Sequence, residues 1–166
     1  FGLTAYAAEQ LVSDKALAEY FETACESSHA PKVLGNLMIS EIFRLLPPES
    51  VSIPIAPAHM GQLADLVEDG VISSSVAKRV VAALWAQDQE PEAWVEANGL
   101  KQLNDETALR AYVQQAIAAH PEMVAGYRAG KLTLSKALMG AAMSLSGGKA
   151  NPAKLQQLMD EALKEA

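Results

Sequence analysis

The sequence has a single cysteine and few aromatic residues. Cys25 is the only cysteine among 166 residues, so the chain cannot form an internal disulfide, and a reducing, cytoplasmic compartment fits best. Aromatic residues make up 5% of the chain, although 50% of its residues are hydrophobic. Alanine and leucine are frequent among them, which favours closely packed helices over a sheet of β-branched residues. The composition therefore predicts an all-α protein.

Membrane-spanning and catalytic patterns are also missing. No apolar run approaches the roughly 20 residues of a membrane span, so no membrane partner is expected. The sequence contains no G-x-S-x-G elbow and no Cys-His-Asn signature. Cys25 and His29 are four apart, as in a zinc pair, but His59 and His120 are isolated and no second cysteine exists. We expect no metal site, no catalytic residue and no cofactor in this chain, which begins at Phe1 like a piece of a longer protein.

The net charge of −7 is distributed unevenly along the sequence. Residues 1–100 contain 5 Lys or Arg against 14 Asp or Glu, whereas residues 101–166 contain 8 against 6. No acidic residue occurs between Glu122 and Asp160, and five basic residues fall in that interval: Arg128, Lys131, Lys136, Lys149 and Lys154. This asymmetry indicates that the C-terminal part contacts an anion, although such a face can also be plain solvated surface.

Apolar residues recur at helical spacing along most of the chain. Helices are predicted over 13–28 and 31–46, and an extended, exposed connection over 47–57, where four prolines occur. A short helix broken at Gly99 resembles a hinge, and three apolar stripes follow it. We therefore predict two small modules of about three helices each: a helical head over 1–90, a partly helical linker over 91–104, and a three-helix tail over 105–166.

The stretch LSGGKANPAKL resembles a phosphate-binding loop at first sight. A nucleotide loop needs a glycine where Met143 stands and a Ser or Thr where Ala150 stands, so this interpretation fails. Helix punctuation remains: Gly148 can take the left-handed conformation after a helix, Asn151 can cap the next helix, and Pro152 can open it. These three residues are the predicted structural caps.

Five segments occur in an order that resembles a known family. They are GLTAYAAEQLVSDKALAEYFE, VEDGVISSSVAKRV, EANGLKQLNDETAL, YRAGK and GAAMSLSGGKANPAKLQQLM. In this order they resemble the C-terminal region of the B subunit of aspartyl/glutamyl-tRNA amidotransferase, from Phe1 to the end of the chain. From about Glu19 onward the stand-alone YqeY-like proteins share the pattern, and the leading segment favours the amidotransferase.

The resemblance implies a helical region attached to a catalytic cradle domain that lies outside this chain. In the family, the B subunit uses ATP and Mg²⁺ to activate the carboxylate of a mischarged Glu-tRNA(Gln) or Asp-tRNA(Asn), and it assembles with the A and C subunits. The helical and tail parts contact the outer corner of the tRNA. The resemblance therefore implies a non-catalytic tRNA-recognition region of an ATP-dependent ligase, with no DNA partner. The alternatives are a helical protein-interaction module and a stand-alone YqeY-like protein.

Lys149 is the leading candidate for a tRNA phosphate contact. A lysine beside a helix start can offer both its charge and unpaired backbone N–H groups to a phosphate. The full set of tRNA-binding candidates comprises Lys149, Arg128, Lys131, Lys136, Lys154 and Lys101.

Overall fold

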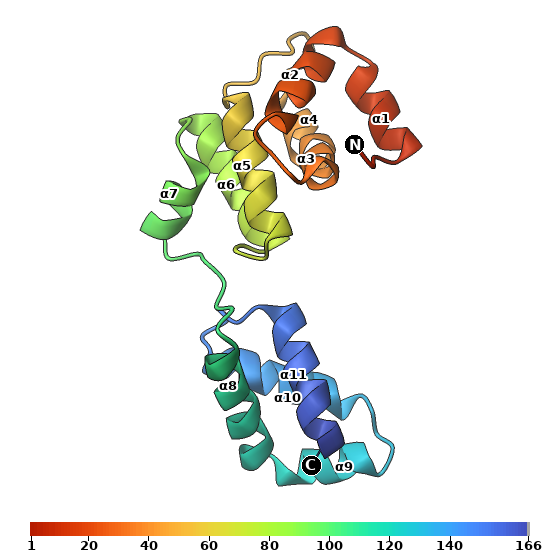
Figure 1. The fold of residues 1–166 in the computed structure, drawn as a ribbon, viewed down its shortest axis with the longest axis vertical. Helices are drawn as coiled ribbons and strands as arrows, with labels where there is room; N and C mark the ends of the chain where they lie inside the picture. Colours follow the sequence, from red (N-terminus) through yellow and green to blue (C-terminus); the bar gives the residue numbers. More distant parts are fainter. Residues whose placement is uncertain (166) are drawn as a thin grey trace. The chain divides into compact units, whose positions relative to one another are not determined.

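Helices account for most of residues 1–165, which the computed structural model describes (Figure 1). Within that range no strand is present, and β-type pairing is limited to an isolated parallel bridge between Leu103 and Ala150. The prediction of an all-α fold is therefore confirmed. The chain divides into two compact units, Phe1–Lys101 and Gln102–Ala166, and each has a hydrophobic core of its own.

The first unit begins most of its long helices with a side-chain cap. Its elements are α1 (Ala5–Val12), α2 (Lys15–Cys25), α3 (Pro31–Leu37), the π-helix η1 (Met38–Ile42), α4 (Phe43–Leu45), α5 (Pro57–Glu68), α6 (Ser74–Ala86) and α7 (Pro91–Ala97). The side chains of Thr4, Asp14 and Ser73 accept hydrogen bonds from the first turns of α1, α2 and α6. Pro57 and Pro91 occupy the first position of α5 and α7, where a missing N–H costs nothing.

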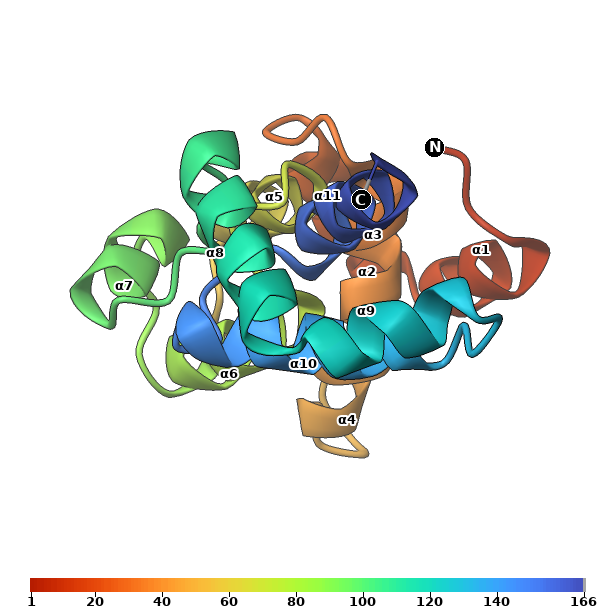
Figure 2. The same cartoon turned by 90° about the horizontal axis from the view of Figure 1, so that it is seen from below.

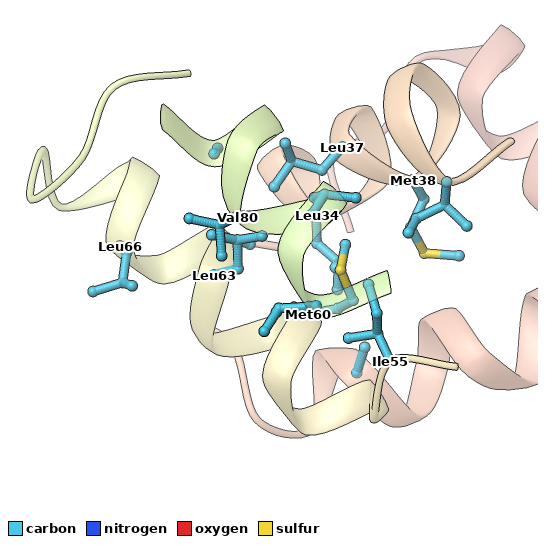
Figure 3. Packing of buried hydrophobic residues seen from close by; sticks show 14 of the residues in the cluster. Leu34, Leu37, Met38, Ile55, Met60, Leu63, Leu66 and Val80 are labelled. Atoms are coloured by element: carbon cyan, nitrogen blue, oxygen red, sulfur yellow. The ribbon is translucent and has the colours of Figure 1, made fainter. Parts of the chain in front are cut away.

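Helix α5 forms the centre of the first core. It packs against α2, α3 and α7, and its Met60 and Leu63 are fully buried beside Leu34 of α3 (Figure 3). At Gly61 the α2 and α5 backbones approach closely, because a Cβ built there would lie 2.5 Å from the Ala24 carbonyl oxygen. This glycine is required for the spacing of the two helices.

Two predicted segments of the first unit differ in detail from the structure. The single helix expected over 31–46 is a continuous helical run that contains a π-helical turn, η1, between α3 and α4. The connection expected to be exposed over 47–57 is anchored instead. Ile55 is 1% exposed, and the Tyr20 hydroxyl donates a hydrogen bond of 2.7 Å to the Ile55 carbonyl oxygen. Burial of Ile55 in the core explains why this proline-rich connection is not solvated throughout.

The segment expected to begin the linker, 91–101, belongs to the first unit. Helix α7 packs on α5 and α6, and its Val95 is fully buried. Gly99 ends α7 in a left-handed turn, with φ +63°, that lets the Leu100 N–H donate to the Val95 carbonyl oxygen at 3.0 Å. Leu100 then packs against the core. Gly99 predicts a hinge when the sequence is read alone. In the structure it ends helix α7, and the next residue, Leu100, is held in place by packing against the core.

The second unit contains four helices in its described residues, where three are expected from the sequence. They are α8 (Glu106–Ala119), α9 (Pro121–Arg128), α10 (Leu134–Leu145) and α11 (Pro152–Glu165). The unpredicted α9 is short and follows α8 at His120, and it packs beside α10 (Figure 2). Leu109, Leu138 and Leu155 are fully buried where α8, α10 and α11 meet. No helix in the described part of either unit is long and apolar enough to cross a membrane.

Candidate nucleic-acid interface

The turn between α10 and α11 is a helix-ending motif built on two glycines. Gly147 and Gly148 have φ values of +64° and +76°, which side chains disfavour. The Gly148 N–H donates to the Met143 carbonyl oxygen at 2.9 Å, and the Gly147 N–H donates to that of Ser144 at 3.0 Å. These bonds satisfy the last carbonyls of α10, so both glycines are explained by helix termination.

Asn151 fastens the other side of the turn. Its Oδ1 accepts hydrogen bonds from the Ala153 and Lys154 N–H groups at 3.1 and 3.4 Å. Its Nδ2 donates to the Asn104 Oδ1 at 2.8 Å. Leu103 adds two backbone bonds, since its N–H donates to the Lys149 carbonyl oxygen at 2.6 Å and its carbonyl oxygen accepts from the Asn151 N–H at 3.0 Å. The turn is thus clamped to the segment that leads into α8.

The clamp leaves no backbone N–H for an anion in this part of the structure. The remaining donors of the turn are also used: the Lys149 N–H donates to the Ser146 carbonyl oxygen at 3.3 Å, and the Ala150 N–H donates to the Ser146 Oγ at 3.1 Å. Pro152 has no N–H to offer. The expectation that the start of α11 presents unpaired N–H groups to a phosphate is therefore wrong. The exposed Lys149 side chain remains available for such a contact.

The basic candidates of the second unit fall into two groups. Arg128, Lys131 and Lys136 lie around the connection from α9 to α10, and we call them the corner cations. Lys149 and Lys154, the turn cations, follow the opposite end of α10. Lys136 lies in the first turn of α10, and at 1.5 Å per residue the part of α10 from Lys136 to Leu145 extends about 14 Å. All five side chains are exposed, and the described residues supply no ion pair to any of them.

Lys101 differs from the other candidates. Its ammonium contacts the Glu96 carboxylate at 2.7 Å and the Glu92 carboxylate at 3.1 Å. The hydrogen bond with Glu96, followed by the one with Glu92, raises the pKa of Lys101 above its ordinary value. The charge is retained but compensated within the first unit, so the assignment of Lys101 as a tRNA contact is not supported. The sequence could not show this because Lys101 appears there beside uncharged neighbours.

Two further features of the second unit are not predicted from the sequence. The Arg110 guanidinium is paired with Glu106 at 2.7 Å and Glu161 at 3.4 Å, so it adds no uncompensated charge. Leu132 lies in the corner between α9 and α10 and is 65% exposed, among the corner cations in sequence. The exposed leucine adds apolar surface near the corner cations. Its position between Lys131 and Thr133 in the sequence predicts a turn but does not predict this exposure.

The histidine weighed as a metal ligand has carboxylate partners instead. His29 contacts Asp69 at 2.9 Å and Asp65 at 3.3 Å. The hydrogen bond with Asp69, followed by the charge of Asp65, raises the pKa of His29. Across the described residues, no three His, Cys, Asp or Glu side chains are grouped so as to hold a metal ion.

Removal of the Asn151 side chain is expected to destabilise the second unit. Asn151→Ala deletes the cap of α11 and the bond to Asn104, and loss of such a cap costs about 1 kcal/mol. Urea unfolding followed by circular dichroism measures the change. Gln114→Ala is the control, because Gln114 is exposed on α8 without a hydrogen bond in the described residues. Equal stability of the two variants would show that the cap contributes nothing.

The comparisons with known proteins agree on one family. The sequence profile of the GatB domain matches residues 19–163. The chain is 40% identical over 167 residues to the B subunit of aspartyl/glutamyl-tRNA(Asn/Gln) amidotransferase from Halorhodospira halophila, with 98% of this chain and 35% of that protein covered. It is 39% identical to the corresponding protein of Rickettsia africae, covering 98% of this chain and 34% of that protein. The chain thus spans about a third of the length of these relatives, and it belongs to the GatB domain family.

Proposed function

We propose that this chain is the C-terminal helical region of an amidotransferase B subunit, and that its second unit contacts the tRNA backbone without taking part in the chemistry. The observation that carries the proposal is the similarity to the GatB relatives along 98% of the chain. The name of those relatives includes tRNA(Asn/Gln). ATP, Mg²⁺ and the contacts with the A and C subunits belong, in this proposal, to the larger parent protein.

The electrostatics of the second unit support a backbone contact. Side chains of Lys and Arg attract phosphates without reading the base sequence, and RNA helices are recognised largely by shape and backbone. The corner cations and the turn cations provide exposed, uncompensated positive charge in an interval free of acidic residues. Because about 14 Å of α10 separates Lys136 from the end of the helix that precedes the turn cations, the two groups contact phosphates at two places on the tRNA. Side chains alone make these contacts, since the backbone donors of the α10–α11 turn are occupied.

A titration with two tRNAs tests the proposed function. The intact chain is titrated with tRNA(Gln) or tRNA(Asn), and separately with a tRNA for another amino acid, at one fixed salt concentration. We expect binding of both, with tighter binding of the cognate species. Absence of binding to every tRNA, together with stable association with the A subunit of the amidotransferase, would favour the protein-interaction module instead.

The chain alone is expected to show no ATP hydrolysis, and turnover by a contaminant-free preparation would contradict the non-catalytic assignment.

A further inference from the structure

A pocket of about 350 Å³ lies between the η1–α4 region and α6 in the first unit. It has the size of a small-ligand site. Its lining consists of one acidic, three basic and three apolar residues: Glu41, Arg44, Leu45, Lys78, Arg79, Val81 and Ala82. The pocket is unrelated to the corner cations and turn cations, which belong to the second unit.

Glu41 is the unusual member of this lining. It lies in the π-helical turn η1 and is 8% exposed, and its Oε1 atom is buried without a hydrogen bond from any of the described residues. Burying a carboxylate oxygen without a hydrogen bond is costly, and native proteins seldom retain such an atom. Single π-turns in α-helices are frequent at functional sites. A hydrogen-bond donor from a ligand would satisfy this oxygen.

The cations around Glu41 also have unused capacity. The Lys78 ammonium is 3.6 Å from Glu41 Oε1, and the Arg44 guanidinium is 3.5 Å from Oε2. Both distances exceed the 2.7–2.9 Å of strong charge-assisted hydrogen bonds. Arg79 has no acceptor among the described residues. Three cations and one carboxylate leave two positive charges uncompensated, so the pocket is suited to an anion.

The apolar side of the pocket narrows the choice of anion. Leu45 is 39% exposed, which leaves apolar surface beside the charged groups. The phosphate groups of a nucleic-acid backbone offer no apolar side chain to cover this surface. In addition, residues 1–101 contain 6 Lys or Arg against 14 Asp or Glu, and this excess of acids repels a polyanion. The ligand is therefore a single anionic group with a neighbouring donor and an apolar substituent.

We propose that this pocket binds the C-terminal residue of a polypeptide. The terminal carboxylate accepts hydrogen bonds from Arg44 and Arg79. The amide N–H of the same residue donates to Glu41 Oε1, once the exposed Lys78 side chain turns from Glu41 to the ligand carboxylate. The apolar side chain of the terminal residue covers Leu45. This inference is independent of tRNA binding. A free α-amino acid also has a carboxylate, an N–H donor and a side chain. The experiment below distinguishes it from a polypeptide C-terminus.

Calorimetric titration of the intact chain tests the proposal with three probes. They are N-acetyl-Ala-Leu with a free carboxylate, the same dipeptide as its C-terminal amide, and free leucine. The free-acid dipeptide is expected to bind about tenfold or more tightly than the amide, because the amide has no negative charge and only one acceptor oxygen for Arg44 and Arg79. Tighter binding of leucine than of the dipeptide would overturn the polypeptide assignment and identify the ligand as a free amino acid.

Two variants and a control locate the site. Arg79→Ala is expected to lower the affinity for the free-acid dipeptide about tenfold or more. This variant should fold normally because Arg79 is exposed. Glu41→Ala is expected to lower the affinity for the dipeptide and for its amide alike, since both probes carry the N–H that donates to Glu41. Lys32 of α3 is exposed and has no ion pair within the described residues, so Lys32→Ala should leave binding unchanged. No binding of any probe, or a loss of tRNA affinity in Arg79→Ala without a change for the dipeptide, would overturn the proposal. Neither result would affect the tRNA contact proposed for the second unit.

Discussion

Replacement of Leu138 by alanine is expected to unfold the second unit while the first stays folded. Leu138 is fully buried in α10, in the cluster that also contains Leu109 and Leu155. Truncation of such a leucine costs about 2–5 kcal/mol, which includes the cavity it leaves. A unit that spans only Gln102–Ala166 has little stability to lose, since small domains bury a smaller share of their surface.

The two tryptophans make this prediction measurable unit by unit. Trp85 and Trp94 both belong to the first unit, so their fluorescence reports its unfolding, whereas far-ultraviolet circular dichroism reports helices of both units. In Leu138→Ala the fluorescence transition should be unchanged, and part of the dichroism signal should be lost at low urea. Leu132→Ala is the control, since that leucine is 65% exposed and its removal should change stability by less than about 0.5 kcal/mol. Equal shifts of both signals in Leu138→Ala would show that the chain unfolds as one cooperative unit.

Gly61→Ala should destabilise the first unit, although the same change usually stabilises a helix. Alanine in a helix interior is favoured over glycine by about 1 kcal/mol. At Gly61, however, the new Cβ would lie 2.5 Å from the Ala24 carbonyl oxygen, a backbone atom that cannot move unless α2 and α5 separate. Overpacking of this kind costs about 1–3 kcal/mol. Tryptophan fluorescence during urea unfolding should therefore report a lower midpoint.

A matched glycine in the second unit serves as the comparison. Gly140 lies within α10, and a Cβ built there meets no atom of the described residues within 4 Å. Gly140→Ala should accordingly stabilise the second unit by up to about 1 kcal/mol, measured by circular dichroism. A stabilised first unit in Gly61→Ala would contradict the close approach of α2 and α5.

Local signals predicted the helices better than the boundaries between the units. Ser73 and Asp14, which are residue types that commonly precede a helix, cap α6 and α2. Gly99 also ends a helix, but the sequence could not show that Leu100 packs back onto the first core and keeps α7 there. Helix α9 was missed because its eight residues present only Val124 as a buried side chain, too few to establish a period.

The charge pattern predicted which part of the chain carries uncompensated cations, but it could not predict their positions in space. The clamp on the α10–α11 turn depends on Leu103 and Asn104, and the Asn104–Asn151 bond joins residues 47 positions apart. Without that contact the start of α11 appears open to a phosphate. Similarly, Lys101 has no acidic neighbour in the sequence but is paired with two glutamates in the structure. The basic residues of the acid-free interval form two groups in the structure, the corner cations and the turn cations, at opposite ends of α10.

The salt dependence of tRNA binding tests the proposed backbone contact most directly. Each phosphate contact contributes about 0.7–0.9 to the slope of log affinity against log salt. The triple variant that replaces the corner cations with alanine should therefore reduce the magnitude of this slope by about 2 to 2.7. The double variant of the turn cations should reduce it by about 1.4 to 1.8. Lys101→Ala, whose ammonium is compensated by Glu92 and Glu96, should leave the slope unchanged. A slope that stays at the wild-type value in both multiple variants, or wild-type binding that does not weaken as salt rises, would contradict the account.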